Sequence, residues 1–137
     1  MIKIQKSISI KASADEVWAI VGDLTRAPEF TPTIVSAHVD GLKRFCKDEG
    51  GNEIHEEMSN YSSELRQYAW RHVKSPLPVK SSEGWYFVRP DGKASIFEMV
   101  WEVDFLDTAL ETQLAPNLEG AVQMTLENLR HLAEKAS

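Results

Sequence analysis

The last stretch of the chain is the feature that most constrains the fold. From residue 118 to residue 136, apolar positions recur at the three- and four-residue spacing of one helix face. That face comprises Leu118, Val122, Thr125, Leu129, Leu132 and Ala136, flanked by Ala121, Leu126 and Ala133. The opposite face is polar and comprises Glu119, Gln123, Glu127, Arg130 and Glu134. The pattern predicts one amphipathic helix that must bury a wide apolar stripe.

The middle of the chain, from Thr33 to Phe105, is expected to form short strands instead. Alternating segments separated by turn-forming residues predict strands over 33–42, 44–47, 53–59, 65–73, 80–88 and 94–105. The alternation from Met1 to Lys11 predicts one more half-buried strand. A long helix that follows antiparallel strands has to bury its stripe on their sheet. One sheet closed by one helix can hold a cavity, so we expect an α+β fold that binds a small molecule.

The first helix signal lies just after the N-terminal strand. Ser13 and Glu16 have the spacing of a capping box, which predicts a short helix over residues 14–21 that ends near Gly22. Residues 24–30 are expected to add one or two helical turns before Pro32. Turns are predicted at 60–63 and 90–92, and a proline loop at 75–78.

Composition limits the classes of function. A length of 137 residues favours one domain, over residues 1–137. The net charge of -6, without any run of Lys or Arg, argues against nucleic acid or an anionic membrane as partner. No apolar run approaches the roughly 18 residues of a membrane span, so we expect no stable membrane insertion. The chain carries no signal-peptide pattern, and we expect a cytoplasmic protein.

The sequence also predicts neither a cofactor nor a metal. Cys46 is the only cysteine, so no internal disulfide can form, and no Cys/His cluster has zinc spacing. Glu98, Glu102 and Asp104 alternate along one strand, and we interpret them as a solvated outer face instead of a metal site. Phosphate-binding loops, nucleophile elbows and His-Glu-x-x-His motifs are all missing from the sequence.

Six segments, taken in order, resemble a known superfamily. They are Ser13 to Trp18 (S/P-x-x-x-V-W), Asp23 with Phe30-Thr31-Pro32 (D…W-x-P), Glu56-Glu57-Met58 (E-x-L), Ser75 to Val79 (small-x-L-P-V), Met99 to Phe105 (V-x-W-x-x-x-F) and Gly120 to Leu132 (N-L-x-x-L). Their order and spacing resemble the START-like (SRPBCC) superfamily, in particular its polyketide cyclase/dehydratase and lipid-transport branch. Phe30 departs from the pattern, where relatives often have Trp.

The resemblance implies the helix-grip fold. In that fold a curved antiparallel sheet, seven-stranded in its full form, wraps around a long C-terminal helix and leaves a pocket between them. Two short helices follow the first strand. The functions found in the superfamily include sterol and lipid carriage, plant hormone sensing, polyketide cyclisation and chaperone co-activation. A fold by itself does not choose among them.

Alternation along each strand predicts which residues face that pocket. On strand 80–88 composition would turn Trp85 and Phe87 inward, whereas the family resemblance turns Ser82, Gly84 and Tyr86 inward, and we follow the resemblance. The predicted ligand-binding residues are Glu56, Met58, Tyr68, Trp70, His72, Leu77, Val79, Tyr86, Phe97, Met99, Trp101, Ala121, Val122 and Thr125. Each of these side chains could equally be ordinary core.

Three functional hypotheses remain from the sequence. The first is a protein that binds or carries a hydrophobic or amphipathic small molecule, which needs only volume and an apolar lining. The second is a polyketide cyclase/dehydratase-type enzyme, in which His72, Tyr68 and Glu56 would move protons. Three titratable groups are few for an enzyme, so the first is favoured. The third is a co-chaperone or toxin-type interaction protein with outward Trp85 and Phe87; the sequence identifies no protein partner.

Overall fold

The computed structural model describes residues 1–136. Strand β1 comes first, and three short helical segments follow it before the remaining strands. The elements are β1 (Ile2–Ile10), α1 (Ala14–Val21), the 3₁₀ helix η1 (Leu24–Arg26), α2 (Ala27–Phe30), β2 (Ile34–Asp40), β3 (Lys43–Asp48), β4 (Glu53–Ser62), β5 (Gln67–Lys74), β6 (Val79–Asp91), β7 (Ala94–Phe105) and α3 (Thr108–Ala136). This order matches the strand and helix order expected from the sequence.

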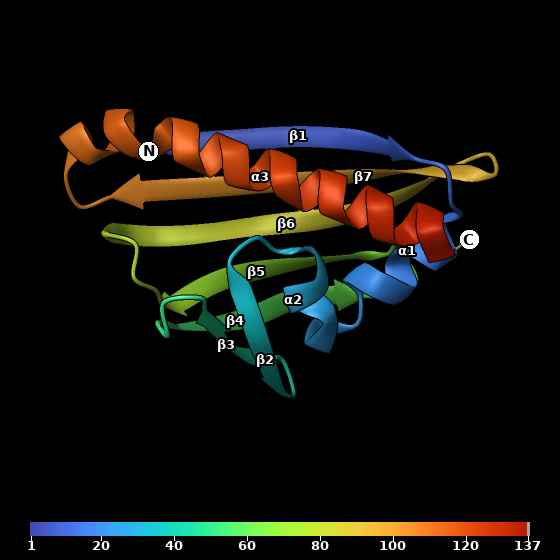
Figure 1. The fold of residues 1–137 in the computed structure, drawn as a ribbon, viewed down its shortest axis with the longest axis horizontal. Helices are drawn as coiled ribbons and strands as arrows, with labels where there is room; N and C mark the ends of the chain where they lie inside the picture. The colour runs from blue at the N-terminus through green and yellow to red at the C-terminus, as the bar shows by residue number, and fades with distance from the viewer. Residues whose placement is uncertain (137) are drawn as a thin grey trace.

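The strands form one antiparallel sheet that is closed by α3. Their order is β1-β7-β6-β5-β4-β3-β2, so the first strand pairs with the last. The sheet is curved, and α3 lies across β1, β7 and β6 (Figure 1). The short helices α1 and α2 lie beside the C-terminal half of α3. The predicted helix-grip arrangement is confirmed.

Helix α3 begins ten residues earlier than the sequence predicted. We expected it to start at Leu118, whereas it starts at Thr108 and passes through Pro116. Asp107 Oδ1 accepts a hydrogen bond from the Ala109 N–H at 2.9 Å, which satisfies one free donor of the first turn. Leu110 and Leu114 extend the apolar stripe backwards and pack on the core. This packing compensates for the backbone hydrogen bond that proline cannot make.

Two predicted turns also lie elsewhere. Residues 60–62 of the turn expected at 60–63 belong to β4, and the turn into β5 falls at residues 63–66. Asn60 adopts a left-handed conformation (φ 52°) where the pairing with β5 is irregular. Asparagine tolerates that conformation, so the strand bends there instead of ending. Strand β6 likewise continues through Pro90 to Asp91, and Gly92 (φ 61°) provides the turn into β7.

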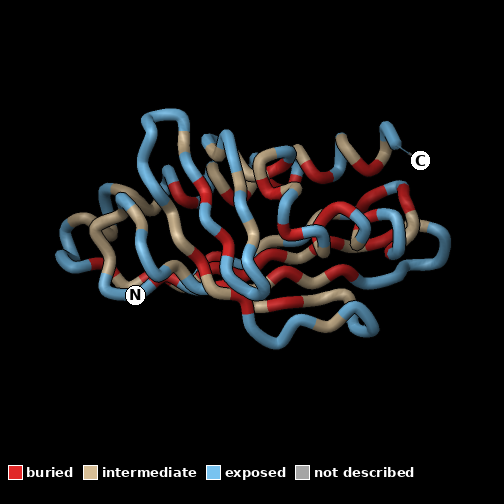
Figure 2. Tube along the Cα trace, turned by 90° about the horizontal axis from the view of Figure 1, so that it is seen from below, coloured by how far each residue is buried: buried red, intermediate tan, exposed pale blue. Residues whose placement is uncertain are grey.

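The core lies between the sheet and the helices. Buried positions, red in Figure 2, follow alternate residues of the central strands and one face of α3, whereas exposed positions gather at the loops. Ser82, Gly84, Tyr86 and Val88 of β6 are buried, which confirms the face chosen from the family resemblance. Trp85 and Phe87 lie on the outer face, half-buried, with their rings stacked 5.3 Å apart.

Gly84 allows the Trp70 side chain to approach the backbone of β6 closely. A Cβ atom built on Gly84 would lie 2.3 Å from the Val100 carbonyl oxygen and 2.5 Å from the Trp70 indole. The indole therefore lies directly against the backbone of the neighbouring strand.

Within residues 1–136, no helix is long and apolar enough to cross a membrane.

Candidate functional site

A cavity of about 310 Å³ lies between the sheet and the middle of α3. Its volume is at the lower end of the range of roughly 300–1,000 Å³ that is usual for ligand sites. Helix α3, the loop before β6 and strands from both halves of the sheet all contribute to its wall. The lining residues are Ala27, Thr31, Pro32, Thr33, Ile34, Arg44, Cys46, Asp48, Ile54, Glu56, Trp70, His72, Ser75, Pro76, Leu77, Tyr86, Met99, Trp101, Leu118, Ala121, Val122 and Thr125.

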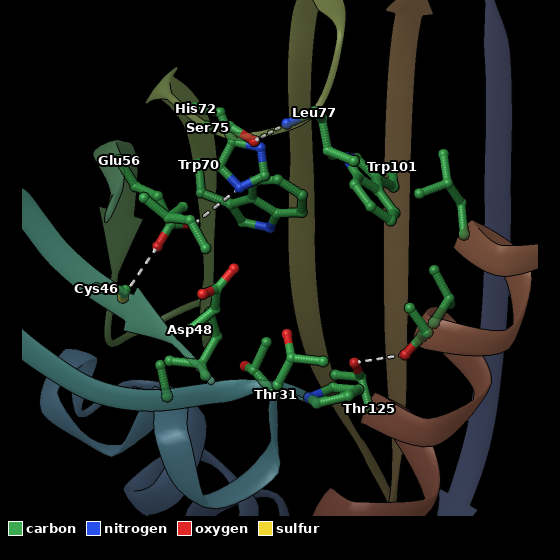
Figure 3. Close-up of a pocket in the computed structure, with 18 of the residues that line it drawn as sticks. Thr31, Cys46, Asp48, Glu56, Trp70, His72, Ser75, Leu77, Trp101 and Thr125 are labelled. Carbon is green, nitrogen blue, oxygen red and sulfur yellow. Dashed lines mark hydrogen bonds and ion pairs between the residues drawn. The ribbon is translucent and has the colours of Figure 1, made fainter. Parts of the chain in front are cut away.

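A polar cluster forms one side of this cavity, and strand register brings its members together. Arg44 of β3 pairs with Glu56 of β4, and Glu56 pairs with His72 of β5. Arg44 Nε donates to Glu56 Oε1 at 2.9 Å, and both side chains are buried. The Nε2 atom of His72 lies 3.7 Å from Glu56 Oε2, on the cavity side (Figure 3). A buried cation thus balances the carboxylate, whose burial alone would be costly.

His72 is held from its other side by a second pair of residues. Its Nδ1 lies 2.8 Å from the Ser82 hydroxyl oxygen, which also accepts a hydrogen bond from Trp101 Nε1 at 2.8 Å. Both Ser82 and Trp101 are buried. The imidazole is therefore fixed in orientation with Nε2 directed towards Glu56 and the cavity.

The electrostatics of the cluster leave one buried ion pair among neutral groups. Burial opposes the charge of Arg44, but the Glu56 carboxylate keeps the pKa of the guanidinium above its usual value. Burial, together with the negative charge of Glu56, raises the pKa of the Cys46 thiol to about 12. Burial likewise raises the pKa of Tyr68 to about 12 and that of Tyr86 still further. At neutral pH the thiol and both phenols are therefore uncharged.

The pKa of His72 shifts in the opposite direction. Burial lowers it below the usual 6.5, although the nearby Glu56 charge partly opposes this effect. The unfolded chain therefore takes up a proton at a higher pH than the folded protein does. We expect the free energy of unfolding to fall as the pH drops through 6.5 towards the lowered pKa of the folded state.

Urea denaturation across this pH range measures the effect, with His72→Gln as the test variant and exposed His131→Gln as the control. Stability should depend less on pH in His72→Gln and should keep the wild-type pH dependence in His131→Gln. An unchanged slope in His72→Gln would contradict the assignment.

Most of the predicted ligand-binding residues line the cavity. These are Glu56, Trp70, His72, Leu77, Tyr86, Met99, Trp101, Ala121, Val122 and Thr125. That they contact a ligand stays a prediction. The expected aromatic wall is present, since the rings of Trp70 and Trp101 lie 6.0 Å apart and those of Trp70 and Tyr86 lie 5.9 Å apart.

Four of the predicted residues do not line the cavity: Met58, Tyr68, Val79 and Phe97. They are core residues or pack against the core, because the space between sheet and helix is filled outside the cavity. Tyr68, for example, is fully buried and packs against Trp18 of α1 with ring centroids 6.2 Å apart. Alternation predicts the inner face of a strand correctly but not how far along that face the open space extends.

Sequence reasoning missed several cavity residues, above all Arg44. It did not identify Arg44 as the partner of Glu56. Arg44 and Cys46 occupy the inner face of β3, whereas the more apolar Phe45 points outward and contacts His55. The available signal was the residue type of Cys46, since free cysteine is often buried and positions 44 and 46 share a face. Within residues 1–136, no three His, Cys, Asp or Glu side chains converge as metal ligands would.

Several solved structures share this architecture. An uncharacterised protein from Bacillus thuringiensis matches with a TM-score of 0.85 at 20% identity, covering 96% of this chain and 98% of that one. The di-domain ARO/CYC protein BexL of the BE-7585A biosynthetic pathway matches with a TM-score of 0.82 at 17% identity, covering 96% of this chain and 46% of that one. Norcoclaurine synthase from Thalictrum flavum, solved with dopamine and hydroxybenzaldehyde, matches with a TM-score of 0.76 at 16% identity, covering 99% and 88%.

At these identities the structural similarity shows the fold. The sheet, the closing helix and the cavity between them define a helix-grip protein of the START-like class. The family model described as polyketide cyclase/dehydrase and lipid transport matches residues 1–134. The chain belongs to this family, whose fold is a ligand-binding fold. None of the curated proteins matches the chain.

Proposed function

We propose that this protein binds or carries a hydrophobic or amphipathic small molecule in the cavity between the sheet and α3. The observation that carries the proposal is the cavity itself, about 310 Å³ in volume, with mainly apolar walls and a compact polar cluster on one side. Ligand sites usually combine an apolar lining with a few placed polar groups. The Trp70 indole N–H adds support, because it is buried without a hydrogen-bond partner in the described residues.

The test fills the cavity from α3. Thr125 is buried and lines the cavity, and its hydroxyl donates to the Ala121 carbonyl oxygen at 2.8 Å. Thr125→Trp should therefore place an indole in the space that a ligand would occupy. We expect the affinity for a fluorescent apolar probe to fall at least tenfold.

The matched control is Met124→Trp, which adds the same indole at the next residue of α3, where the side chain is exposed. Circular dichroism should show that both variants are folded, and titration with the probe should show wild-type affinity in Met124→Trp. Equal probe affinity in the wild-type protein and folded Thr125→Trp would move the site elsewhere and remove the proposal.

A cyclase- or dehydratase-type enzyme is the second candidate, because a neutral, oriented imidazole beside a carboxylate has the composition of an acid–base pair. The two hypotheses predict different effects of His72→Gln. Loss of a general base typically reduces turnover by about 10²–10⁴-fold. Loss of one hydrogen bond to a ligand costs only about 0.5–1.5 kcal/mol of affinity. We favour binding, because one such pair is a small set of groups for catalysis.

A further inference from the structure

In the polar cluster of Arg44, Glu56 and His72, some hydrogen-bonding atoms have no partner among the described residues. Glu56 Oε1 accepts from Arg44 Nε and faces the Cys46 thiol, whereas Oε2 accepts no hydrogen bond from residues 1–136. The 3.7 Å between Oε2 and His72 Nε2 is too long for a direct hydrogen bond. A single oxygen atom on the cavity side can bond to both.

The arrangement of hydrogens indicates what kind of oxygen fits. Ser82 Oγ accepts the Trp101 N–H, so its own hydrogen is free to bond His72 Nδ1. A neutral imidazole that accepts at Nδ1 carries its hydrogen on Nε2. The cluster thus presents a donor at His72 and an acceptor at Glu56. A hydroxyl group is both acceptor and donor, and it matches the two together.

The charge balance indicates what is excluded. Arg44 is the only Lys or Arg among the described residues that line the cavity, and Glu56 already neutralises it. A ligand carboxylate placed between His72 and Glu56 would lie beside a second carboxylate with no free cation. Desolvation of an unpaired anion is costly, and Coulomb repulsion from Glu56 adds to that cost.

We propose that the polar side of the cavity takes an uncharged hydroxyl group, carried by a flat and largely apolar ligand, and that it rejects a carboxylate on the same skeleton. The hydroxyl accepts from His72 Nε2 and donates to Glu56 Oε2. The apolar body lies among Trp70, Trp101 and Tyr86, which are part of the cavity wall. This inference rests on the proposed binding function and adds the class of ligand to it.

The experiment compares naphthalene, 2-naphthol and 2-naphthoate, which share a skeleton, by calorimetric titration at neutral pH. We expect 2-naphthol to bind about tenfold more tightly than naphthalene, the equivalent of about 1.4 kcal/mol. We expect 2-naphthoate to bind more weakly than either. Equal or tighter binding of 2-naphthoate relative to 2-naphthol in the wild-type protein would overturn the inference.

Two variants test the roles of the two residues. His72→Phe removes the hydrogen-bond donor and keeps a ring. The affinity for 2-naphthol should therefore fall to the affinity for naphthalene, and the affinity for naphthalene should stay at its wild-type value. Glu56→Gln keeps an oxygen that can accept from Arg44 but leaves the positive charge of Arg44 unbalanced. The protein should then prefer 2-naphthoate over 2-naphthol by at least tenfold in affinity. A purely structural role would weaken all three ligands alike, and that result would contradict the inference.

The outcomes separate this inference from the function on which it rests. If none of the three compounds binds and the fluorescent probe is insensitive to Thr125→Trp, the binding function itself is wrong. If naphthalene binds and Thr125→Trp blocks it, but 2-naphthol has no advantage, only the hydroxyl assignment fails. The comparison in the wild-type protein decides the matter even if a variant does not fold.

Discussion

Replacing Leu129 with aspartate is expected to unfold the protein. Leu129 is fully buried in the seam between α3 and the sheet, within the main apolar cluster. The substitution removes its apolar contacts and places a carboxylate within the apolar cluster, at a combined cost of at least about 3–5 kcal/mol. A typical domain has only about 5–15 kcal/mol of stability in total. Thermal melting followed by circular dichroism measures the loss.

The matched control for this change is Met124→Asp. Met124 lies on the same helix but is exposed, so the same charge remains in water there. We expect Met124→Asp to melt close to the wild-type temperature. A Leu129→Asp variant that also melted within a couple of degrees of wild type would place Leu129 outside the helix–sheet seam.

The second large effect is expected from Arg44→Met. Arg44 and Glu56 form the buried ion pair of the cavity wall, at 2.9 Å. Methionine is similar in shape but uncharged, so Glu56 is left buried without its cation. Breaking a buried pair in this way typically costs about 3–5 kcal/mol. Urea denaturation should show a correspondingly lower free energy of unfolding.

Two further variants separate charge from packing. Arg71→Met breaks an exposed pair with Glu57 at 2.7 Å on neighbouring strands and should cost less than about 1 kcal/mol. The double variant Arg44→Met/Glu56→Leu removes both buried charges and should recover most of the loss. The losses in free energy of unfolding of Arg44→Met and Glu56→Leu are measured separately as well. If the loss in the double variant equals their sum, the ion pair contributes nothing through charge and the loss is one of packing.

The elements that could be predicted are those with a local physical cause. The capping box at Ser13 and Glu16 is present, with Glu16 N–H bonded to Ser13 Oγ at 3.1 Å, and α1 covers the predicted residues 14–21. The spacing of Leu118, Val122 and Leu129 identified the buried face of α3. Such signals depend on neighbours within four residues, so the sequence contains them in full.

The start of α3 and the limits of the cavity could not be predicted in the same way. Pro116 argues locally against a helix, but packing of Leu110 and Leu114 on the core outweighs that preference. Val79 and Phe97 alternate correctly with their neighbours, yet they lie where side chains fill the space between sheet and helix. Whether that space is open depends on elements distant in sequence.

The sequence by itself determined the order of elements and the inner faces of β4, β5 and β7, whereas the inner face of β6 came from the family resemblance. Only the tertiary structure decided that Arg44 pairs with Glu56 and that Ser82 and Trp101 orient His72. The physical reason lies in the pairing of strands. Alternation assigns a side chain to a face, whereas its partner across the sheet is set by register and curvature, which depend on turns, irregularities and the packing of α3.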